Sequence, residues 1–430
     1  MSGIAAAASG DRAAGAGNRP RVFAAVCGNM LEVFDFIAYG TYAVAIGHAF
    51  FPAKSDFLSL LLSVSTFGIG FVTRPLGALL IGLLADRRGR RAGMSVSLGL
   101  MGLGSLMIAV LPPYAVLGPA APLLLVLARL IQGIAWGGEA GPVTAYLLES
   151  APPGRRGAFG AWQATSQSLA VLLSGAIGLV LTALVGAGAM AGWGWRVPFA
   201  LGVLLVPLGL WLRSRMEEPG EAAATALPGE RASSAAAEAW RARWLLFCGF
   251  LTLVAGTVSQ YFLNYATSFA LTVLHLPQAE ALWPTVAAGV AGAAGAWWFG
   301  RLSDRFGSVP AMAVPRALLA VLIVPLLLLA MRRPDPLLFT VIVALVALLQ
   351  VGGFAASVVA LADALPARMR STGFGLIYAV AISLFGGTAQ TVFALLQHAA
   401  VGPVAIGWYL ALVNAVAVPA AIGLGRRRAG

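Results

Sequence analysis

Long runs of apolar residues, separated by short polar segments, dominate the pattern of this chain. A helix of about 20 apolar residues can cross the ~30 Å hydrocarbon layer of a membrane. Twelve stretches are long enough, with an uncertainty of about one where proline and glycine divide uncharged segments. The pattern predicts membrane-spanning helices at residues 22–50, 57–85, 94–112, 122–148, 158–185, 194–212, 244–272, 280–300, 308–331, 337–362, 371–397 and 403–425.

The one long polar stretch divides these spans into two groups of six. We therefore expect an all-α membrane protein whose twelve transmembrane helices form two pseudo-symmetric six-helix bundles. The expected parts are a cytoplasmic N-terminal segment (1–21), an N-terminal bundle (22–213), a cytoplasmic linker (214–243), a C-terminal bundle (244–425) and a cytoplasmic tail (426–430).

The composition agrees with a membrane protein, because 60% of the residues are hydrophobic and only 10% are charged. Soluble proteins carry about a quarter charged residues, so a soluble enzyme or binding module is excluded. The net charge of +12 does not indicate nucleic acid, because most arginines fall in alternate loops on one side. By the positive-inside rule that side is the cytoplasm. We expect a multi-pass protein of the bacterial inner membrane, surrounded by the lipid bilayer, with both termini in the cytoplasm.

The two halves of the chain repeat each other at a nearly constant offset. The run Gly82-Leu-Leu-Ala-Asp86-Arg87-Arg88-Gly89 returns as Gly300-Arg-Leu-Ser-Asp304-Arg305-Phe306-Gly307, 218 residues later. Further pairs are Gln132 with Gln350, at the same offset, and Glu149 with Asp363, 214 residues apart. A parallel repeat of six spans predicts a substrate site between two bundles near mid-membrane, reached from each side in turn as one bundle rocks against the other.

The motif Gly82-x3-Asp86-Arg87-x-Gly89-Arg90-Arg91 resembles the loop signature between spans two and three of the major facilitator superfamily. Acids at helix ends with guanidinium groups beside them can latch the cytoplasmic side in one state and release it in the other. The second copy has Ser308 and Val309 in place of Arg90 and Arg91, so its latch should be weaker. We assign the cytoplasmic gate to Asp86, Arg87, Arg90, Arg91, Glu149, Arg156, Asp304 and Arg305.

Four further motifs resemble the metabolite:proton symporter family, and within it the bacterial citrate–proton and tricarballylate symporters. They are Gly28-Asn29-Met-Leu-Glu32-Val-Phe-Asp35-Phe36-x-x-Tyr39-Gly40, Phe71-Val-Thr-Arg74-Pro75-Leu-Gly77, Arg129-x-x-Gln132-Gly133 with Gly138-Glu139, and Trp193-Gly194-Trp195-Arg196-x-Pro198-Phe199. The resemblance runs through most of the first half and thins in the seventh span, where substrate specificity could be set. It implies proton-coupled import of a small metabolite.

Three acids and two arginines lie near mid-membrane in the first half, where ionisable residues indicate function. Glu32, Asp35 and Tyr39 share one helical face, which should meet Arg129 on the fourth span. The simplest role of an Asp35–Arg129 pair is architectural. The functional alternative is a carboxylate that exchanges its cationic partner for a proton. With fewer arginines than acids, one acid lacks a counter-charge, and Glu32 or Glu139 is favoured over Asp35 for proton coupling without a choice between them.

The planar guanidinium group binds carboxylates bidentately, so Arg74 and Arg129 are the main candidates for substrate binding. In the second half the one ionisable residue near mid-depth is Arg316, which lies closer to the cytoplasm. Neutral polar residues should complete the cavity: Gln260 and Asn264 fall on one helical stripe, and Gln163 and Tyr39 are further candidates. For each glutamine, an interhelical hydrogen bond is at least as good an explanation.

We therefore predict a transporter, not an enzyme, that imports citrate or a similar di- or tricarboxylate together with protons by alternating access. The isolated histidines give no metal site, and no cofactor is expected besides the proton as coupling ion. We expect a monomer. The sequence leaves open the carboxylate, proton against sodium, the direction of transport and the oligomeric state.

Two alternatives remain. One is a proton-antiport exporter of a drug-like compound on the same fold, favoured if the cavity does not expose Arg74 and Arg129. The other is a non-transporting sensor, which should carry a long cytosolic domain.

Overall fold

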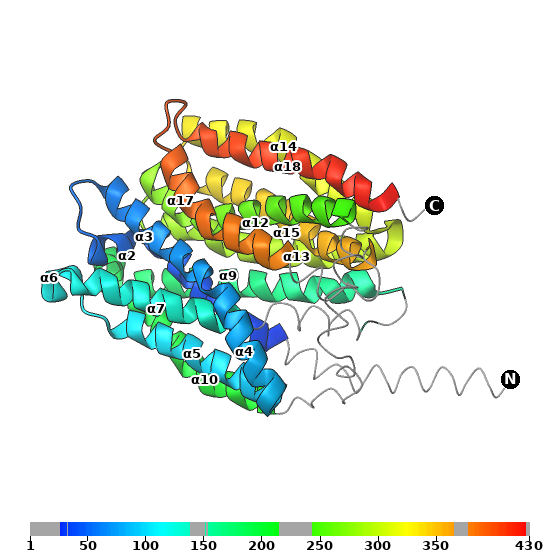
Figure 1. Ribbon diagram of the computed structural model, residues 1–430. Helices are drawn as coiled ribbons and strands as arrows, with labels where there is room; N and C mark the ends of the chain where they lie inside the picture. The colour runs from blue at the N-terminus through cyan, green and yellow to red at the C-terminus, as the bar shows by residue number, and fades with distance from the viewer. Residues whose placement is uncertain are drawn as a thin grey trace.

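The computed structural model is built from helices packed side by side, and it describes residues 26–31, 33–137, 151, 154–214, 243–364 and 377–426. Figure 1 shows two groups of helices, one from each half of the sequence, lying one above the other. The helices are α2 (Ala43–Phe50), α3 (Asp56–Val72), α4 (Arg74–Arg88), α5 (Arg90–Val110), α6 (Tyr114–Leu117), α7 (Ala120–Gly137), α9 (Arg156–Gly192), η1 (Gly194–Arg196), α10 (Val197–Ser214), α12 (Arg243–Thr272), η3 (Glu280–Leu282), α13 (Trp283–Phe306), α14 (Ser308–Arg332), α15 (Pro336–Ala364), η5 (Ile382–Gly386), α17 (Gly387–Leu396) and α18 (Val404–Arg426).

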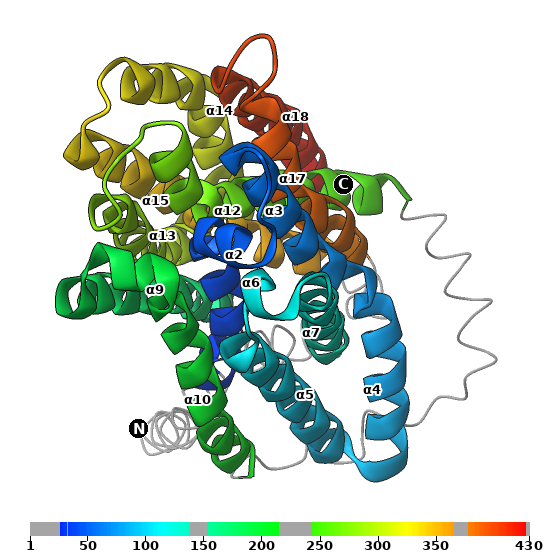
Figure 2. The same cartoon turned by 90° about the vertical axis from the view of Figure 1, so that its left-hand side faces the viewer.

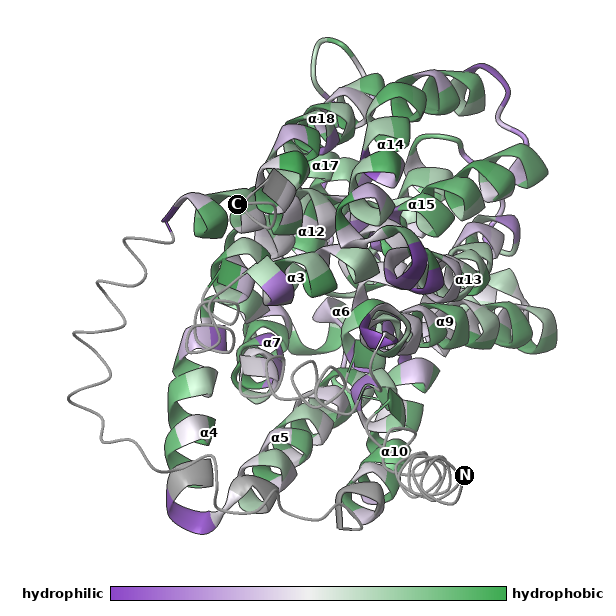
Figure 3. Cartoon of the chain, turned by 90° about the vertical axis from the view of Figure 1, so that its right-hand side faces the viewer, coloured by the Kyte–Doolittle hydropathy of each residue, from purple (hydrophilic) through white to green (hydrophobic). Residues whose placement is uncertain are grey.

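Among the described residues, ten helices are long and apolar enough to cross a membrane, and eleven if a bent first pair counts as one span. Helix α13 completes the twelve, since its 24 residues lie where the eighth span was predicted. Many large apolar side chains are exposed on the surface of the protein, and Figure 3 shows that apolar residues make up most of each helix. The predicted twelve-helix fold is therefore confirmed, with small shifts at the helix ends; the linker expected at 214–243 lies almost wholly outside the described residues.

Two spans that reach the centre of the protein are broken there. The first span bends by 65° between Val26–Thr41 and α2. The Thr41 hydroxyl donates to the Ile37 carbonyl oxygen at 3.1 Å, a back-bond that bends helices. The second span breaks between α3 and α4 at Thr73, whose hydroxyl reaches the Leu130 carbonyl on α7 at 2.9 Å. Pro75 lacks an N–H donor and fits the first turn of α4. Arg74 is therefore the first residue of a helix.

The sequence repeat is a structural repeat. Gly89 ends α4 with φ 88° and ψ 154°, and Gly307 ends α13 with φ 91° and ψ 155°. A positive φ of this kind favours glycine, so the same turn is built from repeat-related residues in both halves. The halves meet where α9 packs along α13 and where α3 packs along α17, an arrangement seen end-on in Figure 2.

Helix α12 is the central helix of the second half. In its most apolar window 72% of the residues are buried inside the protein, against 33% to 56% for the other nine long spans. Its polar residues therefore face protein or a cavity and not lipid.

Glycines let the second span approach α7 closely, and these two helices carry the two central arginines. A Cβ atom added to Gly133 would overlap the carbonyl oxygen of Gly70, and one added to Gly137 would overlap that of Arg74. Backbone therefore lies directly against backbone, as is typical of helix contacts in membranes.

We predict that Gly133→Ala lowers the midpoint of thermal unfolding in detergent, by the equivalent of about 1–3 kcal/mol, because the added methyl group forces the two backbones apart. The control is Gly99→Ala on α5, where a Cβ meets nothing within 4 Å. Equal midpoints for the two variants would contradict this account of the contact.

Candidate functional site

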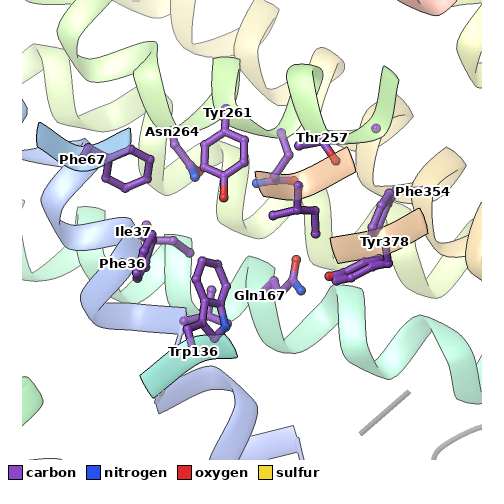
Figure 4. A pocket seen from close by; sticks show the side chains of 14 residues that line it. Phe36, Ile37, Phe67, Trp136, Gln167, Thr257, Tyr261, Asn264, Phe354 and Tyr378 are labelled. Atoms are coloured by element: carbon purple, nitrogen blue, oxygen red, sulfur yellow. The ribbon is translucent and has the colours of Figure 1, made fainter. Parts of the chain in front are cut away.

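A cavity lies between the two halves, with about 610 Å³ of empty space counted with its opening. Figure 4 shows aromatic side chains from both halves around it, with few polar groups between them. Its lining comes from the first span, α3, α7 and α9 in the first half and from α12, α15 and the eleventh span in the second. The lining residues are Val33, Phe36, Ile37, Phe67, Trp136, Gln167, Gly256, Thr257, Gln260, Tyr261, Asn264, Phe354, Tyr378 and Ile382.

The polar part of the wall comes mainly from α12. Gln260 and Asn264, one helical turn apart, both line the cavity, as their shared stripe predicted. The Asn264 side-chain oxygen is buried and has no hydrogen-bond partner among the described residues. Ile382, which also lines the cavity, begins a π-helical turn in the eleventh span, and this turn packs against α12. Such turns are frequent at functional sites because they re-aim side chains.

Arg129 is completely buried on α7, and aromatic rings surround its charge. The guanidinium carbon lies 4.1 Å from the centroid of Phe36, 4.6 Å from that of Tyr39 and 4.9 Å from that of Phe67. The negative faces of these rings stabilise a cation where water is excluded. Phe36 and Phe67 also line the cavity, so the guanidinium lies one ring behind its wall.

Arg74 has a similar environment at the start of α4. Its guanidinium carbon lies 3.5 Å from the centroid of Trp136, a cavity-lining residue, and 4.8 Å from that of Phe71. Its side chain is 8% exposed. Neither arginine is among the residues that line the cavity in this conformation, although both are covered by rings that do.

Asp35 reaches Arg129 through a chain of hydrogen bonds and not by direct contact. Ser105 on α5 donates its hydroxyl proton to Asp35 Oδ2 at 2.5 Å and accepts a hydrogen bond from Gln132 Nε2 at 3.0 Å. The Gln132 side-chain oxygen accepts from Arg129 Nη1 at 2.6 Å. The order is therefore Asp35, Ser105, Gln132, Arg129, which we call the relay.

The helical face of Asp35 and Tyr39 meets Arg129 through the Tyr39 ring, whereas Asp35 itself is linked to Arg129 only through the relay. Two neutral side chains lie between the charges, and the second carboxylate oxygen, Asp35 Oδ1, has no hydrogen-bond partner among the described residues. Gly202 on α10 leaves the space for this oxygen, since a Cβ there would overlap it. The carboxylate is thus buried without a counter-charge in contact, which is costly for an ionised acid. The other two acids of the set, Glu32 and Glu139, lie outside the described residues.

The remaining predicted ligands lie behind the cavity wall. Tyr39 is fully buried, donates its hydroxyl to the Ser63 carbonyl oxygen at 3.2 Å and faces Arg129 with its ring. Gln163 is buried on α9 but does not line the cavity, whereas Gln167, one turn further along, does. Tyr39 and Gln163 therefore shape the site from behind in this conformation.

The gate residues described in the structure link the two halves at one end of the bundle. Arg156, at the start of α9, pairs with Asp363 on α15 at 2.9 Å. Asp363 is the repeat partner of Glu149, a predicted gate residue that lies outside the described residues. Asp304 of α13 accepts the backbone N–H groups of Gly157 at 2.6 Å and Ala158 at 2.9 Å. A carboxylate at a helix N-terminus is favourable, so two carboxylates of the second half hold α9 in this state.

Two further gate candidates have exposed side chains. Arg305 is exposed and lies over Phe306, and Arg87 is exposed in the last turn of α4. The side chains of Asp86, Arg90 and Arg91 lie outside the described part.

Contacts between the halves continue on the far side of the cavity. The Phe57 and His398 rings stack with centroids 3.8 Å apart, and the Ser65 and Thr391 hydroxyls lie 3.4 Å apart. Cross-half contacts therefore lie toward both ends of the cavity in this conformation.

Sequence reasoning missed the aromatic lining and Ser105. Phe36 and Trp136 lie in or beside the sequence motifs, and this position could have indicated their role. Ser105 lies in a long uncharged span, where nothing in the sequence distinguishes it. Arg316 had a signal, as the lone ionisable residue within its span, and was set aside because of its depth.

The sequence matches a known protein family. Residues 26–391 match the family described as the Major Facilitator Superfamily. The chain belongs to this superfamily. The fold expected from the sequence resemblance is therefore correct, and this is a multi-pass membrane transporter and not an enzyme.

Two relatives are similar over most of the chain. The citrate-proton symporter of Klebsiella pneumoniae is 36% identical over 84% of this chain and 81% of its own. The alpha-ketoglutarate permease of Escherichia coli K12 is 34% identical over 96% and 95%. Among solved structures, a D-xylose-proton symporter has a TM-score of 0.75 over 95% of this chain and 97% of its own, at 18% identity, which shows the shared fold.

We predict that Ser105→Ala lowers the free energy of unfolding by about 1–3 kcal/mol, because it leaves Asp35 and the Gln132 amide without their shared partner in a dry site. The measurement is thermal unfolding in detergent. The control is Ser63→Ala, because the buried Ser63 hydroxyl has no partner among the described residues and its loss should cost little. If both variants unfold at the wild-type temperature, the relay has no energetic weight.

We predict that breaking the Arg156–Asp363 pair opens that end of the protein more often. A single cysteine at Gln260, in a chain with Cys27 and Cys248 replaced, reports access to the cavity in vesicles. Arg156→Asp should raise labelling by an impermeant thiol reagent applied from the Arg156 side, and adding Asp363→Arg should lower it again. The control is Arg305→Ala. If Arg156→Asp, the double variant and Arg305→Ala are all labelled at the wild-type rate, this pair does not act as a latch.

Proposed function

We propose that the chain is a proton-coupled symporter that imports a small di- or tricarboxylate, of the size of citrate or 2-oxoglutarate, by alternating access. The observation that carries the proposal is the relay, which joins a buried acid without a contacting cation to an arginine at the cavity margin. The similarity to a citrate-proton symporter and an alpha-ketoglutarate permease over most of the chain supports the substrate class.

Proton coupling requires an acid that gains and loses a proton as the protein changes state. Asp35 is buried, and among the described residues it accepts one hydrogen bond, from Ser105, and its Oδ1 has no partner. A neutral carboxylic acid is far cheaper than a carboxylate in such a place. Among the described residues, Asp35 is therefore our candidate for the proton carrier, and Glu32 and Glu139 lie outside them.

Substrate binding requires cations for the carboxylates, and Arg74 and Arg129 provide them once the covering rings move. Trp136 and Phe36 separate these guanidinium groups from the cavity and are part of its wall. When the relay changes its protonation, Gln132 and Arg129 can re-aim toward the cavity. Gln260 and Asn264 supply neutral hydrogen-bonding groups for the substrate from α12.

The exporter alternative predicted a cavity from which the two arginines are hidden, and in this conformation they are covered. The relatives favour the symporter. Transport under an imposed pH gradient distinguishes the symporter from the exporter, because a proton symporter accumulates carboxylate on the side opposite the acidic solution.

We further propose that the Arg156 end faces the cytoplasm, in agreement with the arginine-rich loops. One chain supplies both halves of the cavity, so we propose that the monomer transports.

We predict that purified wild type in proteoliposomes accumulates labelled citrate or 2-oxoglutarate when the outside is acidic, and does so without a sodium gradient. Uncharged drug-like compounds and the zwitterion betaine should not compete. Uptake driven by sodium alone, or indifferent to the pH gradient, would rule out proton symport.

We predict that Asp35→Asn keeps exchange of labelled for unlabelled substrate but loses accumulation against a gradient, because the amide imitates the protonated acid and cannot release a proton. The control is Asp56→Asn, which alters an exposed acid that pairs with His48 at the outer end of α3. Normal accumulation by Asp35→Asn would move the proton site to another acid.

A further inference from the structure

Arg316 on α14 is a fully buried cation in the second half, and its known partners are neutral. Its Nη1 donates to the side-chain oxygens of Gln350 at 3.0 Å and Asn414 at 3.2 Å. Gln350 in turn donates to the Gly256 carbonyl oxygen at 2.6 Å, and Asn414 donates to Ser259 at 2.9 Å. These bonds fix the guanidinium plane against α12, α15 and α18.

One edge of this guanidinium group is bare. Nε and Nη2 of Arg316 are buried and have no hydrogen-bond partner in the described structure. These two nitrogens present parallel N–H groups on the same edge, and that fork fits a carboxylate side-on. The free donors thus form a complete bidentate site.

The charge of Arg316 also has no carboxylate beside it in the described part of the chain. The acids described in the second half, Glu280, Asp304, Asp335 and Asp363, lie at or near the ends of helices. A buried cation without a counter-ion is costly, and in membrane proteins such a residue usually serves transport. An anion that arrives with the substrate would remove this cost.

Nη2, one of the two nitrogens of the bare edge, lies beside Gly256, a residue of the cavity wall. A Cβ at Gly256 would lie 2.8 Å from Arg316 Nη2 and 2.6 Å from the ring of Phe354, and both Gly256 and Phe354 line the cavity. The glycine therefore leaves only its backbone and one ring between the guanidinium group and the space where substrate would bind.

The same pattern recurs in the first half. Arg129 Nη1 donates to Gln132, and Arg316 Nη1 donates to Gln350, the repeat partner of Gln132. Each half thus holds an arginine by a repeat-related glutamine just behind the cavity wall.

We propose that Arg316 binds a carboxylate group of the substrate from the second half, opposite Arg129 and Arg74 in the first. The inference rests on the proposed carboxylate transport. It explains a preference for substrates with two or more carboxylates, because only these join the cations of both halves and draw the halves together.

The test uses the full chain in detergent and compares Kd values for citrate and for a monocarboxylate of similar shape, 2-hydroxyisobutyrate. Arg316→Gln should weaken citrate binding by about tenfold or more, since a charged bidentate contact is lost. It should change the monocarboxylate much less. Arg316→Lys should restore part of the citrate affinity. A purely structural arginine would weaken both ligands alike, or neither, and would overturn the proposal.

A second variant keeps the arginine. Gly256→Ala should place a methyl group between Arg316 and the cavity and selectively weaken citrate binding. Gly249→Ala is the matched control on the same helix, since its Cβ would meet Leu361 at 2.5 Å and no residue of this site. If Arg316→Gln does not fold, the comparison of Gly256→Ala with Gly249→Ala tests the proposal. Equal citrate affinities for these two variants would refute it.

Wild-type transport separates the two hypotheses. If the wild type does not bind or transport any carboxylate, the proposed function fails. If the wild type transports citrate while Gly256→Ala and Arg316→Gln keep its affinity, only the role of Arg316 fails.

Discussion

A charge inside a membrane protein must be compensated by the protein itself, because the surrounding lipid offers neither water nor ions. In the described part of this chain, the buried charges near the cavity are compensated mostly by neutral groups. Arg129 lies among three aromatic rings, Arg316 is held by two amides, and Asp35 is held by a serine hydroxyl. The architecture of the centre follows from this constraint.

Because neutral groups stabilise the buried charges, these charges can exchange their partners. A tight buried ion pair would be lost only at a cost of several kcal/mol, and it would resist the arrival of a proton or a substrate. The Ser105 hydroxyl can donate to an ionised Asp35 and accept from a protonated one, while Gln132 keeps its hydrogen bond from Arg129. Aromatic faces stabilise a guanidinium group and leave its N–H donors free for a carboxylate. The neutral groups that stabilise the buried charges therefore also leave these charges able to bind a proton or a carboxylate.

Much of the fold could be predicted from the sequence, because lipid restricts a spanning segment to a long apolar helix. The repeat was also visible in the sequence, where Gly89 and Gly307 occupy equivalent positions. The structure shows that both residues build the same turn with positive φ. Distances between side chains were less accessible. Helical spacing placed Asp35 and Arg129 at similar depth but could not show that Ser105 and Gln132 lie between them. The rings over Arg74 and Arg129 were hidden for the same reason, because in an apolar span an aromatic residue at a cavity looks like one that faces lipid.

The two halves divide the chemistry unequally, although they share one architecture. Gln132 and Gln350 occupy equivalent places and each accepts from an arginine. In the first half the series of hydrogen bonds continues from Gln132 through Ser105 to the buried acid Asp35. In the second half it runs from the Gln350 amide to the backbone of α12. Among the described residues, the first half thus holds the buried acid that we propose as the proton carrier, and α12 holds the neutral groups that we propose as substrate contacts. In the proposed mechanism this inequality gives the two halves different roles, because the proton changes the charge of one half and the substrate binds to both.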